Sequence, residues 1–294
     1  MNKKHPMKVS AGDRVFAGAI TVFMTAYGLI ALVPLLTELA LSLSSKAAAD
    51  TNSVMLLPVG FTLDSWKYMI SQATLWRSVW LSVSSMVIGV IIALVINVLM
   101  AYPLSKKEFK PAKFLMLFVV FTMIFKAPTV PYYLTIKSLK LINNYWVLVL
   151  PQVLSAYNLI VMRSFFAAFP HEIEEAAEID GCGKFQTLLS IVVPSSKPVL
   201  ATVGLFYGVA SWNQYQTPLM FIQKTELFPL QLKINQLIKA GGDLLAITKV
   251  ANVNYTTATL GAVAIIFAII PVLLVYPFLQ KYFAQGAMIG SVKG

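Results

Sequence analysis

Charged residues are scarce in this chain of 294 residues, because 23 Lys and Arg and 12 Asp and Glu make up only 12% of it. That fraction is about half of the share found in soluble domains. Hydrophobic residues account for 58% of the chain, and the mean hydropathy is +0.75. A soluble fold must cover its surface with charge, whereas a bilayer requires long segments that carry none. The composition therefore argues against a soluble enzyme and predicts a polytopic membrane protein.

Cysteine and histidine are also rare, with Cys182 alone and His5 and His171 far apart. A single cysteine excludes a disulfide within the chain, and two separated histidines do not form a zinc cluster. The sequence also lacks the G-x-x-x-x-G-K-[ST] loop that holds phosphates, so this chain is not expected to hydrolyse ATP. We expect no metal and no cofactor in the chain itself, and no catalytic residue.

The basic residues outnumber the acidic ones and give a net charge of +11. Between membrane spans, such residues indicate topology and contacts with anionic lipid, and no basic cluster interleaved with aromatic residues points to a nucleic-acid partner. Four basic residues lie in the first 14 positions, and four lysines lie in residues 105–113. The positive-inside rule then places both termini in the cytoplasm.

Long apolar segments predict an all-α fold with six transmembrane helices. Each segment is near the roughly 20 residues that cross a bilayer, and the first is too long for a cleavable signal peptide. The first segment contains Glu38, which is the only acidic residue in any of the six expected spans. Ion-driven carriers usually place ionisable groups within their spans, which makes that class of transporter the weaker alternative. The expected spans are residues 15–43, 79–102, 114–131, 145–169, 199–222 and 257–282.

The spans divide the rest of the chain into a cytoplasmic tail and loops. The tail covers residues 1–14 and the transmembrane domain residues 15–294, with external loops at 44–78 and 223–256 and a cytoplasmic loop at 170–198. In the last external loop, residues 230–238 have helical spacing, and the two glycines in residues 240–243 predict a turn.

Acidic residues crowd together only in the cytoplasmic loop, from Pro170 to Gly181. Proline favours a helix start, glutamates complement the positive end of the helix dipole, and glycine favours a helix end, so a short helix is predicted. One narrow face of this helix carries small side chains that permit another protein to approach closely. That face consists of Ile173, Ala176, Ala177 and Asp180.

The same loop resembles the EAA loop of permease subunits in binding-protein-dependent ABC importers. The residues that carry the resemblance are Glu175, Ala176, Ala177, Asp180, Gly181, Ile191 and Pro194. Further short matches resemble carbohydrate-uptake permeases of the maltose-importer type, closest to the branch that handles larger or unusual oligosaccharides. They lie at residues 144–151, 210–213, 228–231 and 288–290. Two departures are Cys182, where the family usually has alanine, and Phe125–Pro128, where it usually has a glycine-containing turn.

The resemblance implies a multi-pass permease of the bacterial inner membrane with four kinds of partner besides lipid. These are a second homologous permease subunit, two cytoplasmic ATPases that bind ATP and Mg²⁺, an extracytoplasmic solute-binding protein and the carbohydrate. It also implies that the seven loop residues transmit motion from the ATPases and do no chemistry. An acidic oligosaccharide such as an alginate fragment is one substrate within the branch, and an ion-coupled carrier of a small polar solute is the alternative function.

Polar and aromatic residues within the spans are candidates for the carbohydrate path, because a sugar needs hydrogen bonds along its edge and stacking on its faces. The candidates are Asn97, Tyr207, Trp212, Asn213, Gln214 and Tyr215. The alternative is structural, since such groups also bond between helices or form belts at the membrane surface. On the same segment, Gly204 and Gly208 form a G-x-x-x-G pair that predicts close helix packing.

Overall fold

The computed structural model describes residues 11–125, 127–248 and 254–291. Most of the expected tail and residue 126 of the atypical stretch lie outside these ranges. All regular secondary structure in the described ranges is helical, which confirms the predicted all-α fold. The chain divides into two compact units. One comprises Met1–Ser71 with Ile238–Phe267, and the other comprises Gln72–Leu237 with Ala268–Gly294.

The first unit contains a long amino-terminal helix and two short ones, α1 Ala11–Ser42, α2 Lys46–Asp50 and α3 Asp64–Ser71. The most apolar stretch of 18 residues in α1 has no residue buried within the chain. The side chains of this stretch are therefore available to lipid. Helix α3 packs on the start of the carboxy-terminal helix through a hydrogen bond from Ser65 Oγ to Thr259 Oγ1 at 2.9 Å and a stacked pair of rings, Tyr68 and Tyr255.

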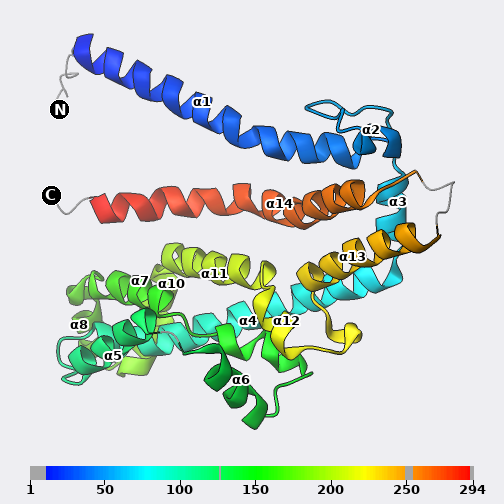
Figure 1. The fold of residues 1–294 in the computed structure, drawn as a ribbon. Coiled ribbons are helices and arrows are strands. Elements are labelled where there is room, and N and C mark those ends of the chain that lie inside the picture. The colour runs from blue at the N-terminus through cyan, green and yellow to red at the C-terminus, as the bar shows by residue number, and fades with distance from the viewer. Residues whose placement is uncertain (1–10, 126, 249–253, 292–294) are drawn as a thin grey trace. The chain divides into compact units, whose positions relative to one another are not determined.

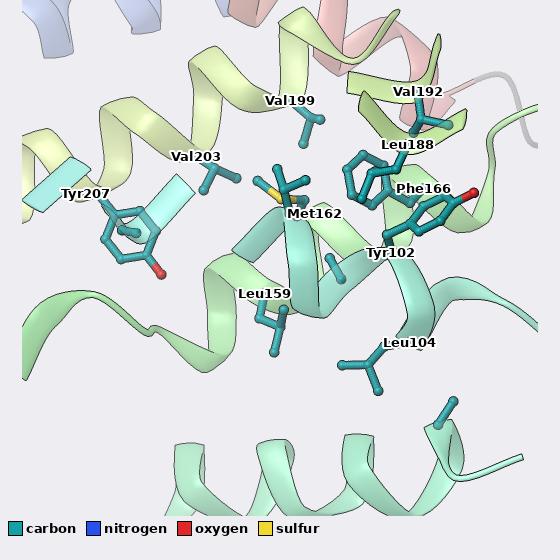
Figure 2. Close-up of a cluster of buried hydrophobic side chains, with 14 residues drawn as sticks. Tyr102, Leu104, Leu159, Met162, Phe166, Leu188, Val192, Val199, Val203 and Tyr207 are labelled. Atoms are coloured by element: carbon teal, nitrogen blue, oxygen red, sulfur yellow. The ribbon is translucent and has the colours of Figure 1, made fainter. Parts of the chain in front are cut away.

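The second unit is built around α4, Ala73–Ser105, with α7, Ala156–Ala167, and α11, Lys197–Trp212, packed along it (Figure 1). A Cβ atom added at Gly204 of α11 would lie 3.5 Å from Leu94 of α4. The predicted close packing at this glycine is confirmed. Figure 2 shows the core between these helices, where Leu159, Met162 and Val203 have no exposed surface.

Shorter elements complete the second unit. Helix α5, Ala112–Ile124, packs on α4 and α7, and the loop at residues 170–198 forms a run of short helices. The remaining elements are α6 Thr129–Ser138, η1 Tyr145–Leu148, η2 Leu150–Gln152, α8 His171–Ile179, α9 Lys184–Thr187, η3 Leu188–Val192, α10 Val193–Ser195, α12 Gln216–Phe221 and η4 Thr225–Leu227. Two long helices, α13 Leu230–Thr248 and α14 Thr257–Ser291, contribute residues to both units.

Within the described residues, three helices are long and apolar enough to span a membrane alone, and the number rises to six if each bent pair of helices is one span. The predicted third and fourth spans are therefore bent pairs of helices, and the remaining bent pair turns at Ser196, before the predicted fifth span begins. The third, fourth and fifth spans each contain a point where the helical hydrogen bonds stop. Pro128 precedes α6, Pro151 lies in η2, and α11 ends before Asn213. A proline lacks the backbone donor that a helix interior requires.

The prediction of a turn at residues 240–243 is wrong, because α13 continues through these residues to Thr248. Glycine costs only about 1 kcal/mol in a helix interior. The part of α13 that belongs to the second unit buries Leu230, Leu232 and Leu237, and this burial contributes more than that cost.

Candidate functional site

The acidic segment of the loop at residues 170–198 forms α8, and the predicted helix is confirmed. Its end is closed by two backbone hydrogen bonds, from Cys182 N to Ala177 O and from Gly181 N to Glu178 O. This pattern is a Schellman cap, which requires a left-handed residue at its centre. Gly181 supplies it with a φ of +86°. The loop glycine is therefore needed to turn the chain away from α8.

The two sides of α8 differ in what they contact. Ala177 is only 4% exposed and faces the interior of this chain, together with Glu174. Glu175, Ala176 and Asp180 are exposed. The expectation that Ala177 shares an outward docking face is therefore corrected. A 100° step per residue places neighbouring positions on adjacent sides of a narrow helix, and the inner side takes Ala177.

After α8, the loop returns to the core. Leu188 and Val192 of η3 are buried in the cluster shown in Figure 2. Ile191 is half-buried beside them, and Pro194 is exposed in α10. Of the seven residues of the EAA resemblance, five are exposed, Ile191 is half-buried and Ala177 is buried.

Charged side chains hold α8 in place. Glu174 forms an ion pair with Lys106, the residue that follows the last turn of α4, and His171 lies 4.0 Å from the same carboxylate. On the exposed side, Lys184 donates a hydrogen bond to Glu178, which lowers the pKa of that carboxyl. The sequence analysis did not single out Lys106 or Glu174, because their contact joins residues 68 positions apart.

An open cleft of about 460 Å³ lies beside the start of α7 and the middle of α11. Amide, hydroxyl and aromatic side chains share it with apolar ones, which is the usual lining of a site for a small polar ligand. The rings of Tyr157 and Phe206 lie 6.0 Å apart. The lining residues are Gln152, Leu154, Ser155, Tyr157, Asn158, Phe206, Tyr207 and Ala210.

Tyr207, one of the predicted path residues, lines this cleft, and a second one, Asn97, bonds to it. The hydroxyl of Tyr207 accepts hydrogen bonds from Asn97 Nδ2 at 2.9 Å and from the backbone N–H of Ser155 at 2.8 Å. Asn97 has no exposed surface, and its Oδ1 has no hydrogen-bond partner within the described residues. Tyr207 thereby joins α4, the start of α7 and α11 at one oxygen atom, and it still has its own hydrogen to donate.

The other four path candidates lie away from the cleft lining. Trp212 is buried and donates from Nε1 to the carbonyl of Ala268 at 3.0 Å. Asn213 is exposed, and its amide bonds within its own helix to Val209. Gln214 donates to the carbonyl of Leu148 at 3.3 Å and accepts from Gln152. Tyr215 is half-buried before α12. The structure gives Trp212 and Gln214 bonds between helices.

Sequence reasoning missed most of the cleft lining. Gln152, Ser155 and Asn158 follow Pro151 in a segment that was expected to be a plain span. A serine shortly after a proline, at the head of an apolar run, is a signal for a new helix start, and Ser155 Oγ does accept from the N–H of Asn158. Among the described residues, no group of three His, Cys, Asp or Glu side chains is placed to bind a metal ion.

Comparisons with known proteins agree with this arrangement. Residues 78–288 match the family described as binding-protein-dependent transport system inner membrane component. The chain is 38% identical to protein LplC of Bacillus subtilis strain 168 over 296 residues, which cover 100% of both chains. It is 36% identical over 286 residues to the polygalacturonan/rhamnogalacturonan transport system permease protein YtcP of the same organism, covering 96% of this chain and 99% of YtcP.

A solved structure is also similar. It is described as a bacterial ABC transporter involved in the import of the acidic polysaccharide alginate, and one of its chains matches with a TM-score of 0.83 and 31% identity, covering 95% of this chain and 100% of that chain. These similarities support the importer function over the ion-coupled carrier. With its bent apolar helices and its capped acidic loop, the chain belongs to the inner-membrane permease family of binding-protein-dependent transport systems and has the fold of an ABC importer permease.

Proposed function

We propose that this chain is one of two permease subunits that together import an oligosaccharide, driven by ATP hydrolysis in two partner ATPases and supplied by an external solute-binding protein. The observation that carries the proposal is α8, which exposes Glu175, Ala176 and Asp180 while Glu174 and Ala177 fix its inner side to the chain. A rigid helix with one free face suits docking onto an ATPase that closes on ATP and rocks the helices as a body.

The cleft beside Tyr207 is the proposed contact with the sugar. Tyr157 and Phe206 offer aromatic faces, and Gln152, Asn158 and the Tyr207 hydroxyl offer hydrogen bonds, which are the two kinds of contact that a sugar ring needs. The similarity to proteins named for polygalacturonan, rhamnogalacturonan and alginate favours an oligosaccharide that contains uronic acids. The excess of basic residues in the tail and in residues 105–113 supports a cytoplasmic position for both termini.

The test is a binding screen of the partner solute-binding protein followed by reconstitution of the complete complex. Oligogalacturonate, oligoalginate and an uncharged arabino-oligosaccharide are compared by calorimetry, and the bound sugar is then offered to vesicles that contain the complex. We expect uptake only with ATP inside the vesicles and binding protein outside. Uptake that follows an ion gradient without ATP would contradict the proposal.

The proposed path through the cleft makes a separate prediction. Alanine in place of Tyr157 should reduce uptake with little effect on the amount of complex, because the half-exposed ring lines the cleft. Alanine in place of Trp212 should instead lower the amount of complex, because that ring is buried and bonds to Ala268. The amounts are measured by purification and the uptake per complex in vesicles. If the two variants had equal effects on uptake per complex, the sugar path would not pass through this cleft.

A further inference from the structure

One ion pair joins α8 to the long helix that forms the centre of the second unit. The Glu174 side chain is 5% exposed and that of Lys106 is 21% exposed, so the pair is largely removed from water. The ammonium group of Lys106 also lies 4.5 Å from the centre of the Tyr102 ring, in a cation–π contact. Lys106 directly follows the last turn of α4, where a positive charge complements the helix dipole.

The same end of α4 is held from a second side. Arg163 of α7 donates from Nε to the carbonyl of Leu104 at 3.0 Å. The last turn of α4 is therefore fixed to α7 by one basic residue and to α8 by another. Of the two contacts, only that of Lys106 reaches the exposed acidic helix.

Helix α4 also leads to the cleft. Asn97 lies nine positions before Lys106, about 14 Å along the helix at 1.5 Å per residue, and donates to the hydroxyl of Tyr207. A displacement of the end of α4 by α8 thus acts on a helix that already bonds to a residue of the cleft lining.

We propose that the Glu174–Lys106 ion pair is the joint through which movement of α8 is passed to α4 and from there to Tyr207 at the cleft. This proposal rests on the proposed function and adds the positioning residues that couple the docking helix to the path. Both side chains act through helices and touch neither ATP nor sugar.

A buried ion pair is by itself weak evidence of stabilisation, because an apolar pair of similar size often serves as well. Removing one partner, in contrast, leaves a buried charge unpaired. The informative variants therefore change both residues. One is the apolar double variant Lys106→Met with Glu174→Met, and the other is the exchanged pair Lys106→Glu with Glu174→Lys.

A control pair exists elsewhere on α4. Arg77 of α4 and Glu226 of η4 also form an ion pair, but their side chains are 58% and 70% exposed, and neither residue belongs to α8. Exposed pairs of this kind contribute little to stability. The control variant is Arg77→Met with Glu226→Met.

The experiment reconstitutes the complete complex with its binding protein and measures sugar molecules taken up per ATP hydrolysed in the same vesicles, with ¹⁴C-labelled oligogalacturonate and oligoalginate in parallel. Because this ratio is taken per turnover, it does not depend on how much complex assembles. We expect the apolar double variant to lower the ratio roughly tenfold, within the range of coupling between contacting residues. The exchanged pair should recover part of it, because the charges are again opposite but the contact of a positive charge with Tyr102 and with the end of α4 is lost. The control should leave the ratio unchanged.

Each outcome bears on a different statement. A wild-type complex that takes up neither sugar with ATP overturns the proposed function. A wild-type complex that works, beside an apolar double variant with an unchanged ratio, overturns the joint alone. An exchanged pair as defective as the apolar variant also overturns it, since opposite charges in contact are then not what matters.

Discussion

A single glycine decides the direction of the chain after α8. Gly181 has a φ of +86°, and a Cβ added there would meet no atom within 4 Å, so the cost of a larger residue is conformational. Gly181→Ala should therefore cost about 1–2 kcal/mol of local stability. Hydrogen exchange of the α8 amides in the complex measures this as faster exchange. The control is Gly183→Ser, at a residue with an ordinary φ of −71°, and equal protection in both variants would contradict the argument.

Gln214, which follows α11, joins this part of the chain to η1 and η2 by side-chain hydrogen bonds. Its amide donates to the carbonyl of Leu148 and accepts from Gln152, and the residue is buried. Gln214→Ala should lower the free energy of unfolding by about 1–3 kcal/mol, because buried polar groups lose their partner. Asn213→Ala is the neighbouring control, since that side chain is exposed and bonds within its own helix. Melting temperatures of the complex in detergent compare the two, and similar losses would refute the role of Gln214.

At the scale of one helix, the burial of one side of α8 and the exposure of the other predict different effects when Trp replaces each of two neighbouring alanines. Ala177→Trp places a large ring in a packed interior and should cost about 1–3 kcal/mol or more of stability, as overpacking does in cores. Ala176→Trp is on the exposed side and should leave the isolated permease as stable as before, while ATP hydrolysis no longer drives uptake. Melting temperature and uptake per ATP separate the two effects. An Ala176→Trp complex with normal uptake would show that this side does not dock.

The helices also show how far sequence reasoning reaches. Long apolar segments predicted α1, α4 and α14, and acidic patterning with proline and glycine predicted α8, because those signals are local. The breaks near Pro151 and Asn213 were missed, since the contacts there join distant segments. Gln214 donates to the carbonyl of Leu148 and accepts from the side chain of Gln152. Contacts between distant segments also divide the path candidates. Tyr207 lines the cleft and accepts from Asn97, whereas Trp212 is buried and donates to Ala268.

For the whole molecule, topology is testable with one background variant, because Cys182 is the only cysteine. In a Cys182→Ser chain, we expect a membrane-impermeant maleimide to label Asp50→Cys in spheroplasts and Lys107→Cys only after lysis. Asp50 is exposed, and the charge pattern places residues 44–78 and 105–113 on opposite sides of the membrane. Labelling in the reverse order would mean that both termini lie outside the cytoplasm.

The subunit as a whole is also expected to show no ATPase activity without its partners. It has no phosphate-binding loop, so the purified chain should hydrolyse no ATP, and activity should appear only when both ATPases are added. Colorimetric detection of released phosphate measures this, with the complete complex as the positive control. Specific turnover by the isolated chain would contradict the division of labour between subunits.

The different lengths of the helices set an order for assembly during synthesis. Helix α1 is 32 residues long and buries none of its most apolar window, so it can enter the bilayer from the translocon on its own composition. Helix α7, with 12 residues, is too short to do so alone, but together with η1 and η2 it forms a bent pair that is long enough. The buried side of α7, with Leu159 and Met162, packs against α4 and α11. A ribosome that stalls before residue 212 therefore leaves the core of the second unit unfinished.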